Sequence, residues 1–179
     1  MRADWVDPAL LDHILAALTP ENELALRVSM ATGLRIDDVL HIKAAQVERG
    51  PRFTVTERKT GKHKRIYVPE LLRDQMLRRS GRYYVWENRL DPKRPRTRQA
   101  VWKDLKRAAR LFRVSDSLNV TPHTARKVYA VEAFAKYGKA DKVRELLNHS
   151  NEAVTALYLM SEALTRQKLH GRPQQRGKK

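Results

Sequence analysis

The chain has 179 residues, a length that suits one domain or a small domain with a tail. Its 37 Lys and Arg against 20 Asp and Glu give a formal net charge of +17, which favours a polyanionic partner, although a ribosomal-type or simply basic protein has the same balance. The absence of cysteine excludes disulfides, thiolate metal sites and a thiol nucleophile. No apolar run reaches the length of a membrane span, so we expect an intracellular protein with no membrane segment.

The first part of the chain predicts two helices. Asp7–Pro8 is a typical helix start, and apolar residues recur at helical spacing over Leu10–Leu18. Thr19–Pro20 repeats the start signal. The second helix is expected to end at Gly33, because glycine is favoured just after a helix.

Arg35 lies between this second helix and a third helix that is expected to begin at Ile36. A junction between two packed helices holds its backbone firmly, which suits a functional arginine. The alternative is an ordinary surface residue, or an ion pair with Asp37 or Asp38. Asp38 would either support a site around Arg35 or simply favour the positive end of its helix.

Residues 52–58 and 65–68 alternate apolar and polar side chains around Thr60–Gly61, a pattern that predicts a β-hairpin with a glycine turn. Lys59 lies at the expected tip. The simplest interpretation is a solvated basic turn that touches a nucleic-acid backbone. The other basic residues placed there are Arg58, Lys62, Lys64 and Arg65.

Residues 88–113 hold ten Lys or Arg and only two Asp. Within them a loop leads to a helix that Thr97 is expected to cap. The apolar positions of this helix form one core stripe, which consists of Val101, Leu105, Ala108, Ala109 and Phe112. A charge run is often only a solvated face, but this density favours phosphate contacts. The residues that we select for these contacts are Lys103, Arg107 and Arg110.

The last part of the chain holds the strongest chemical pattern. Thr121–Pro122 predicts a helix start, and His123 and Arg126 share one face of that helix because they are three residues apart. His149 follows a short helix, and the next helix carries Tyr158. An arginine fork matches phosphate oxygens, and a tyrosine beside such a cluster is a candidate nucleophile on a phosphodiester. The alternative for Tyr158 is an ordinary tyrosine of the core.

Five ordered elements together resemble the tyrosine recombinase, or phage integrase, family. ATGLRIDDVLHIK (residues 31–43) resembles the family's first-arginine box, and ERKTGKHKRIYVP (residues 57–69) resembles its hairpin lysine. The His-x-x-Arg pair, the second His and the Tyr follow in the family's order. The resemblance implies an α+β, mainly α-helical catalytic domain with a small antiparallel sheet near residues 52–68. It also implies a catalytic set of Arg35, Lys59, His123, Arg126, His149 and Tyr158, with Asp38 in support.

The same resemblance implies a site-specific DNA recombinase that uses no metal and no cofactor. Tyr158 would attack the scissile phosphorus and form a 3′-phosphotyrosyl link with release of a 5′ hydroxyl. The two arginines would hold the non-bridging oxygens, and His123 would take or return the tyrosine proton. His149 would donate a hydrogen bond to the phosphate, and Lys59 would protonate the leaving oxygen.

The implied partners are double-stranded DNA and further copies of the protein, in a dimer or tetramer assembled on DNA through the C-terminal helix. The implied location is the cytoplasm, at the nucleoid of a prokaryotic or phage-infected cell. Residues 1–170 would be the catalytic domain and residues 171–179 a disordered basic tail, with the family's N-terminal core-binding domain absent. Ala125 stands where leucine is usual in the family, and Asn148 where glycine is usual.

Two other functions stay open. A DNA-binding regulator or accessory protein on the same fold would bind without catalysis, and retention of all six candidate residues disfavours it. A type IB topoisomerase would use the same covalent chemistry to nick and reseal one strand. The compact length and the spelling of the boxes fit integrases better.

Overall fold

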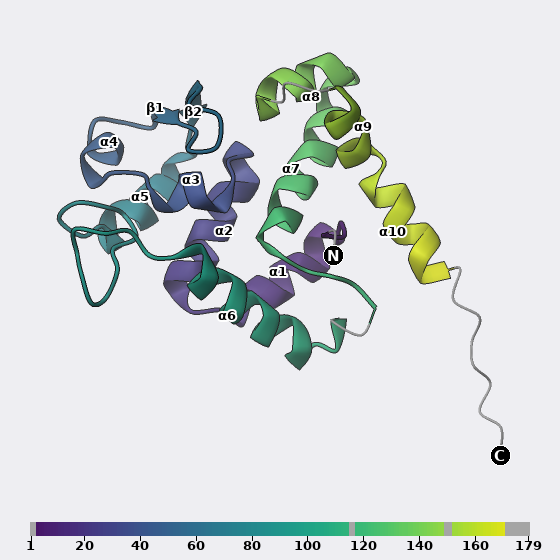
Figure 1. Cartoon of the computed structure of the whole chain (residues 1–179), viewed down its shortest axis with the longest axis horizontal. Helices are drawn as coiled ribbons and strands as arrows, with labels where there is room; N and C mark the ends of the chain where they lie inside the picture. The colour runs from purple at the N-terminus through teal and green to yellow at the C-terminus, as the bar shows by residue number, and fades with distance from the viewer. Residues whose placement is uncertain (1–2, 115–116, 149–151, 171–179) are drawn as a thin grey trace.

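Helices make up most of the described chain, which comprises residues 3–114, 117–148 and 152–170 of the computed structural model (Figure 1). One two-stranded antiparallel sheet accompanies them, so the expected mainly helical α+β fold is confirmed. In chain order the elements are α1 (Pro8–Ala16), α2 (Pro20–Thr32), α3 (Ile36–Leu40), α4 (Ala44–Glu48), β1 (Arg52–Thr56), β2 (His63–Tyr67), α5 (Glu70–Arg79), α6 (Arg98–Leu111), α7 (Pro122–Tyr137), α8 (Ala140–Leu147), α9 (Glu152–Leu159) and α10 (Ser161–His170).

Local signals set the ends of the first two helices. Asp7 caps α1 by accepting a hydrogen bond of 3.0 Å from the backbone nitrogen of Ala9, and Pro8 takes the first helical position. Gly33 ends α2 in the left-handed conformation, with φ of 68°. A Cβ at Gly33 would lie 2.5 Å from Cε1 of Tyr129 on α7, so this glycine also permits the close approach of α2 and α7.

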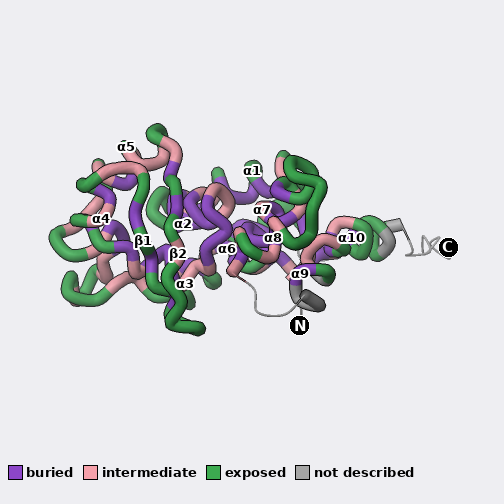
Figure 2. The backbone as a smooth tube through the Cα atoms, turned by 90° about the horizontal axis from the view of Figure 1, so that it is seen from above, coloured by how far each residue is buried: buried purple, intermediate pink, exposed green. Residues whose placement is uncertain are grey.

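The main core is built around α2 and α7, which pack against each other. Buried side chains of α1, α3 and α6 join them, and the buried segments in Figure 2 run along these helices. Leu26, Leu34 and Leu105 are among the largest fully buried side chains. Each such side chain contributes roughly 1.5–3 kcal/mol to folding. The junction between α2 and α3 therefore lies directly on this packed core.

One position of the predicted core stripe of α6 is wrong. The first four residues of the predicted α6 stripe are buried, but Phe112 is 45 % exposed. The reason is that α6 ends at Leu111, and Phe112 is already its C-cap residue. The helical spacing that placed Phe112 on the inner face no longer holds there.

A second, smaller apolar cluster joins α7, α8 and α9. It consists of Ala130, Ala133, Val143 and Leu147, with Tyr129, Leu146, Tyr158 and Leu159 packed against it. α10 continues from α9 and returns to the start of the chain. There the backbone nitrogen of Trp5 donates to Oγ1 of Thr165 at 3.2 Å, and Lys168 pairs with Asp4. The C-terminal helices are thus anchored both to α7 and to the N-terminal segment.

The sheet is the predicted hairpin. Its register pairs Arg52 with Tyr67 and Thr56 with His63, and the buried side chains of β1 alternate with exposed ones. Residues 57–62 connect the strands and carry Lys59. The backbone of this connection turns at Gly61, whose φ is 69°.

Candidate active site

Arg35 is the N-cap residue of α3 and follows the turn at Gly33. Its side chain is 20 % exposed, and Nη1 donates a hydrogen bond of 2.9 Å to Oε2 of Glu57. Asp38, one turn further along α3, has an oxygen 3.9 Å from the same nitrogen. The guanidinium is therefore held by acidic groups while part of it stays open to solvent.

Asp38 and Glu57 are buried and form the acidic side of the site. Oδ1 of Asp38 accepts a hydrogen bond of 2.9 Å from the backbone nitrogen of Arg58, and Oε2 of Glu57 accepts one of 2.9 Å from the hydroxyl of Thr60. Burial raises the pKa of Asp38. Burial alone would also raise the pKa of Glu57, but the hydrogen bonds from Thr60 and Arg35 outweigh it and lower this pKa. Glu57 is thus ionised at neutral pH.

His123 and Arg126 lie in the first turns of α7. Thr121 caps this helix, and its Oγ1 accepts a hydrogen bond of 3.3 Å from the backbone nitrogen of His123. Arg126 is 1 % exposed, and Nη2 donates to the carbonyl oxygen of Leu147 at 2.6 Å while Nη1 donates to that of Gly33. This buried arginine therefore links α7 to the ends of α2 and α8.

Four other residues of the site, Arg35, Tyr158, Glu57 and Asp38, affect the pKa of Arg126. Burial and the charge of Arg35 lower the pKa of Arg126 to about 10, against the opposing effects of Tyr158, Glu57 and Asp38. Arg126 therefore stays protonated at neutral pH. Two guanidinium groups and two carboxyl groups share one region, and the arginine forks have the geometry that phosphate oxygens favour.

His123 lies at the edge of this region, and part of its side chain is exposed. Surrounding protein atoms lower the pKa of His123, and the charges of Arg126, Arg35, Lys127 and Lys59 lower it further. The imidazole is therefore neutral at neutral pH and can accept a proton. Because the charge of Lys59 contributes to the lowered pKa of His123, this lysine of the hairpin loop lies within electrostatic range of the imidazole.

Tyr158 is half-buried on α9, where its ring packs against the second apolar cluster. Nζ of Lys127 lies 5.8 Å from the centre of this ring. The phenol is also close enough to Arg126 to affect the pKa of that arginine. The carbonyl of Tyr158 accepts a hydrogen bond from the hydroxyl of Ser161, which holds the junction of α9 and α10.

Five of the six predicted catalytic residues belong to the described chain, and although they come from the α2–α3 junction, the hairpin loop, α7 and α9, each interacts electrostatically with at least one of the others. They are Arg35, Lys59, His123, Arg126 and Tyr158. His149 lies outside the described residues. The individual catalytic roles stay predictions.

The predicted DNA contacts of the hairpin differ in their surroundings. Lys62 and Arg65 are exposed, and Arg58 is exposed while its Nε pairs with an aspartate of α3 at 3.1 Å. Lys64 is turned inward, and its Nζ donates to the carbonyl oxygen of Thr32 at 2.9 Å. Burial lowers the pKa of Lys64 to about 8. A contact between Lys64 and a DNA backbone would require this internal hydrogen bond to open.

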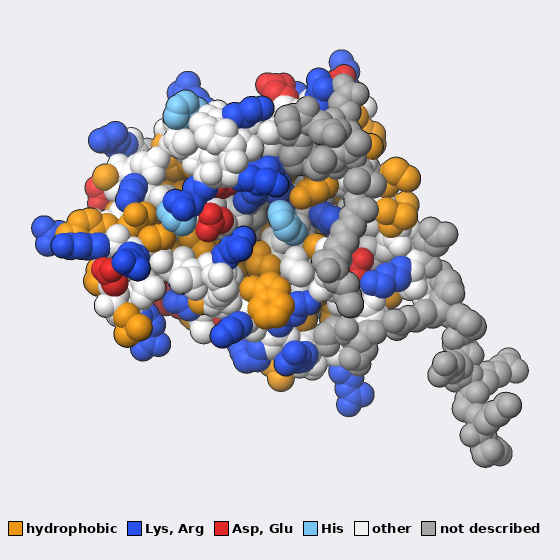
Figure 3. Space-filling view, viewed as in Figure 1, with side chains coloured by type: hydrophobic (Ala, Val, Ile, Leu, Met, Phe, Trp, Pro, Cys, Tyr) orange, Lys and Arg blue, Asp and Glu red, His pale blue; other side chains and the backbone are white. Residues whose placement is uncertain are grey.

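The predicted contacts on α6 are exposed. Lys103 and Arg110 are solvated, and Arg107 pairs with Asp104 at 2.7 Å and donates to the carbonyl oxygen of Ala17. Figure 3 shows Lys and Arg side chains spread over one face of the molecule, with fewer acidic side chains among them. Such a surface attracts a phosphate backbone.

Sequence patterns miss three residues that contact the site. Glu57 and Thr60 are bonded to each other, and Glu57 also binds Arg35, whose position is 22 residues earlier. Lys127 approaches Tyr158 and donates to the carbonyl oxygen of Ala3 at 2.8 Å. The only local signal in the sequence that could have identified Glu57 as a site residue is its acidic side chain within a strongly basic hairpin.

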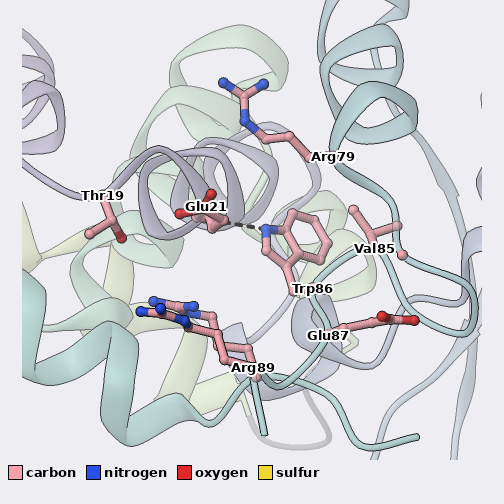
Figure 4. A pocket seen from close by; sticks show the side chains of 9 residues that line it. Thr19, Glu21, Arg79, Val85, Trp86, Glu87 and Arg89 are labelled. Carbon is pink, nitrogen blue, oxygen red and sulfur yellow. Dashed lines mark hydrogen bonds between the residues drawn. The ribbon is translucent and has the colours of Figure 1, made fainter. Parts of the chain in front are cut away.

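A separate pocket of about 370 Å³ lies between the start of α2 and the segment that follows α5 (Figure 4). Trp86 lines it and donates from Nε1 to the carbonyl oxygen of Glu21 at 2.9 Å. The other lining residues are Thr19, Glu21, Arg79, Gly81, Val85, Glu87, Arg89 and Arg96. None of the five described catalytic candidates lines this pocket, so it is distinct from the candidate active site.

Within the described ranges, no three His, Asp or Glu side chains are grouped so that they could hold a metal ion. No helix of the same ranges is long and apolar enough to cross a membrane.

The phage integrase family matches residues 5–164, so the chain belongs to this family and the resemblance found in its sequence is confirmed. A tyrosine recombinase of Thermosipho africanus is 26 % identical over 165 residues, which cover 87 % of this chain and 56 % of that protein. The chain therefore spans about half the length of the relatives that it matches.

Two solved structures share the fold. The lambda integrase dimer bound to a COC′ core site matches with a TM-score of 0.73 and 16 % identity, over 90 % of this chain and 49 % of that one. The catalytic domain of bacteriophage HP1 integrase matches with a TM-score of 0.66 and 18 % identity, over 99 % of this chain and 100 % of that one.

Proposed function

We propose that the chain is the catalytic part of a site-specific DNA recombinase that cuts and rejoins strands through a 3′-phosphotyrosyl intermediate. The observation that carries the proposal is the meeting of Arg35 and Arg126 beside a neutral His123, with Tyr158 in electrostatic range. The part of the Arg35 guanidinium that stays open to solvent matches a non-bridging oxygen of a phosphodiester, and Arg126, whose fork is bound to two backbone carbonyl groups, adds its positive charge from within the protein.

The first step is a transesterification. The hydroxyl of Tyr158 gives its proton to the ring of His123, and the phenolic oxygen attacks the scissile phosphorus. The bond between phosphorus and the 5′ oxygen breaks as the 3′-phosphotyrosyl bond forms. Lys59 gives a proton to the leaving 5′ oxygen, so a 5′ hydroxyl is released. The phosphodiester is conserved as a phosphotyrosyl ester, and no nucleotide is consumed.

Charge stabilisation falls to the arginines. Negative charge builds on the non-bridging oxygens in the pentacovalent transition state, and the fixed cations Arg35 and Arg126 offset it. His149 would add a hydrogen bond to the same phosphate. Asp38 would support Arg35 through the ion pair between Oδ2 of Asp38 and Nη1 of Arg35. In the reverse step, a 5′ hydroxyl of another strand gives its proton to Lys59 and attacks the phosphorus of the phosphotyrosyl ester, the bond between phosphorus and the phenolic oxygen breaks, and His123 returns the proton to Tyr158.

The proposed partner is double-stranded DNA, which would lie across the basic face of Figure 3. The lambda integrase that shares the fold is described as a dimer bound to a core site, and we extend DNA binding and self-assembly to this chain. α10 would carry the contact between copies in a dimer or tetramer on DNA. Residues 1–170 would form the catalytic unit.

The test is covalent trapping. The protein is incubated, without metal, with labelled duplex DNA from the region that flanks its own gene, nicked beside candidate sites so that the cut strand is lost. A denaturing gel then resolves protein–DNA adducts, with Tyr158→Phe as the control. We expect an adduct with a free 5′ hydroxyl from the wild-type chain and none from the variant.

The other outcomes separate the alternatives. Band shifts on a native gel without any adduct would contradict an active recombinase and favour a DNA-binding regulator. An adduct on the nicked duplex, together with an intact duplex that is only resealed and never exchanged onto a second duplex, would favour a topoisomerase. Transfer of the labelled strand to a second duplex supports recombination.

A further inference from the structure

We propose that Glu57 is a positioning residue that fixes Arg35 and the loop of Lys59 relative to each other. This inference rests on the proposed function, and it assigns to Glu57 a role in the same reaction. Glu57 does not touch the reacting atoms. Its effect would pass through the two residues that do.

One oxygen of Glu57 joins two elements. Oε2 accepts hydrogen bonds of 2.9 Å from Nη1 of Arg35 and of 2.9 Å from the hydroxyl of Thr60. Arg35 belongs to the α2–α3 junction, whereas Thr60 is the neighbour of Lys59 in the hairpin loop. A single carboxylate therefore sets the distance between the first arginine and the loop that carries the lysine.

The backbone of Glu57 holds the same loop. Its nitrogen donates to the carbonyl oxygen of Lys62 at 2.9 Å, and its carbonyl oxygen accepts from the nitrogen of Gly61 at 2.7 Å. These bonds close the connection of residues 57–62 around its first residue. The exposed Lys59 thus belongs to a loop whose first residue, Glu57, is fully buried and fixed by hydrogen bonds.

The electrostatics also suit a positioning role. Glu57 is ionised, since hydrogen bonds and nearby cations outweigh the effect of burial. It lies among Arg35, Arg126 and Lys64, each of which interacts with it. Arg35 is 20 % exposed and Glu57 is 0 % exposed, so the carboxylate lies on the inner side of the guanidinium. It can hold Arg35 and leave the outer side of the fork for a phosphate.

Stability alone does not account for this carboxylate. A buried ion pair is often no more stabilising than apolar residues of the same size, because both charges must be desolvated. Oε1 of Glu57 is also buried without a hydrogen-bond partner among the described residues, which adds to that cost. An apolar side chain at position 57 could serve folding equally well. A carboxylate is needed there only if Arg35 and the loop of Lys59 must be held at a fixed distance from each other.

The experiment compares two substrates with the full chain. One is the nicked duplex that traps the adduct, and the other carries sulfur in place of the bridging 5′ oxygen at the scissile phosphate. A thiolate leaves without protonation, so the second substrate does not need Lys59 as an acid. Single-turnover rates, DNA affinity and thermal unfolding are measured for Glu57→Gln and Thr60→Val. Glu48→Gln, an exposed change on α4, is the matched control.

We expect Glu57→Gln to cleave the oxygen substrate about 100-fold more slowly at unchanged DNA affinity, since small misplacement of reacting groups has effects of this size. On the sulfur substrate, Glu57→Gln should recover part of the lost rate, because that substrate does not need Lys59. The recovery should be incomplete, because Arg35 is still held less firmly. Thr60→Val should cleave the oxygen substrate about tenfold more slowly than the wild type, a smaller effect than removal of a general acid would have. It should cleave the sulfur substrate at the wild-type rate. Glu48→Gln should match the wild type.

The inference is overturned if Glu57→Gln, folded, cleaves both substrates at wild-type rates, or if its loss only follows the fraction of unfolded protein. Should Glu57→Gln fail to fold, Thr60→Val decides: equal loss on both substrates rules out the link to Lys59. A wild-type chain that forms no Tyr158-dependent adduct overturns the proposed function and this inference together. A wild-type adduct with unaffected variants overturns the role of Glu57 alone.

Discussion

Arg126 donates a hydrogen bond of 2.6 Å from Nη2 to the carbonyl oxygen of Leu147, the last residue of α8. Its Nη1 binds the carbonyl oxygen of Gly33 just beyond α2. Carbonyl groups at helix C-termini lack partners within the helix and carry partial negative charge, so the guanidinium both satisfies them and is stabilised by them. One buried side chain therefore fixes two helix ends beside the candidate site.

Replacement of Arg126 by Lys should affect folding as well as cleavage. A single ammonium keeps the charge but cannot reproduce the planar fork that spans both carbonyl groups. We expect Arg126→Lys to lower the free energy of unfolding by roughly 2 kcal/mol, because a buried acceptor loses its donor, and to abolish the adduct. Urea unfolding followed by circular dichroism measures the first effect. The same change at the exposed Arg107 should leave the unfolding midpoint nearly unchanged, and an equal midpoint for both variants would contradict the role of Arg126 in folding.

Gly33 and Gly138 allow backbone strain to be separated from steric contact. Both are left-handed, with φ of 68° and 66°, but a Cβ at Gly138 meets nothing within 4 Å whereas one at Gly33 would meet the ring of Tyr129. We expect Gly138→Ala to destabilise by about 1 kcal/mol through strain alone. Gly33→Ala should cost at least roughly 2 kcal/mol, because α2 and α7 must also separate. Thermal unfolding of both variants checks this, and equal losses would show that the α2–α7 contact adjusts freely.

The parts of the fold that follow from local patterns were predictable from the sequence. Asp7, Thr97 and Thr121 cap their helices as expected, and Gly33 ends α2. Each of these signals lies within a few residues of its effect. The hairpin is equally local, since its alternation and its glycine turn occupy one short stretch. The residues of the candidate site could be proposed from the sequence because they stand in ordered, recognisable boxes, and their catalytic roles stay predictions.

Side-chain partners across the fold could not be predicted in this way. The bond between Arg35 and Glu57 depends on how the hairpin lies against α3, and no periodicity encodes that distance. Lys64 belongs to a basic run that predicts a surface, yet its ammonium is bound to Thr32. Phe112 fits the helical stripe, but the helix ends one residue too early. In each case a contact or an end set by tertiary packing overrides the local pattern.

Lys64 should make stability depend on pH in the alkaline range. Burial first, and then the charges of Arg126 and Arg35, lower its pKa to about 8 from 10.5, against the opposing effects of Glu57 and Asp38. Between these values the unfolded chain holds the proton and the folded chain releases it. The unfolded state then binds more protons, so this residue's contribution to stability rises with pH from about 8 to 10.5.

The matching variant is Lys64→Met, which cannot titrate. Relative to this variant, the wild type should gain up to about 3 kcal/mol in unfolding free energy as the pH rises through that window. Urea unfolding at a series of pH values gives the difference between the two proteins, in which the other titrating groups cancel. A difference that stays constant over the series would show that Lys64 titrates alike in both states.

His123 should titrate below its ordinary value of 6.5, because the surrounding protein atoms and then the charges of Arg126, Arg35, Lys127 and Lys59 disfavour the imidazolium. Proton NMR of the free chain, with the resonance assigned through His123→Asn, measures the midpoint directly. Lys59→Gln removes one of these charges, so it should move the midpoint upward without a change of fold. In the cleavage reaction, the acidic limb of kcat/KM should lie at the same pH as this midpoint, since that limb reports the free enzyme's base. A midpoint at or above 6.5, or one that Lys59→Gln leaves in place, would contradict a neutral imidazole held by the surrounding cations.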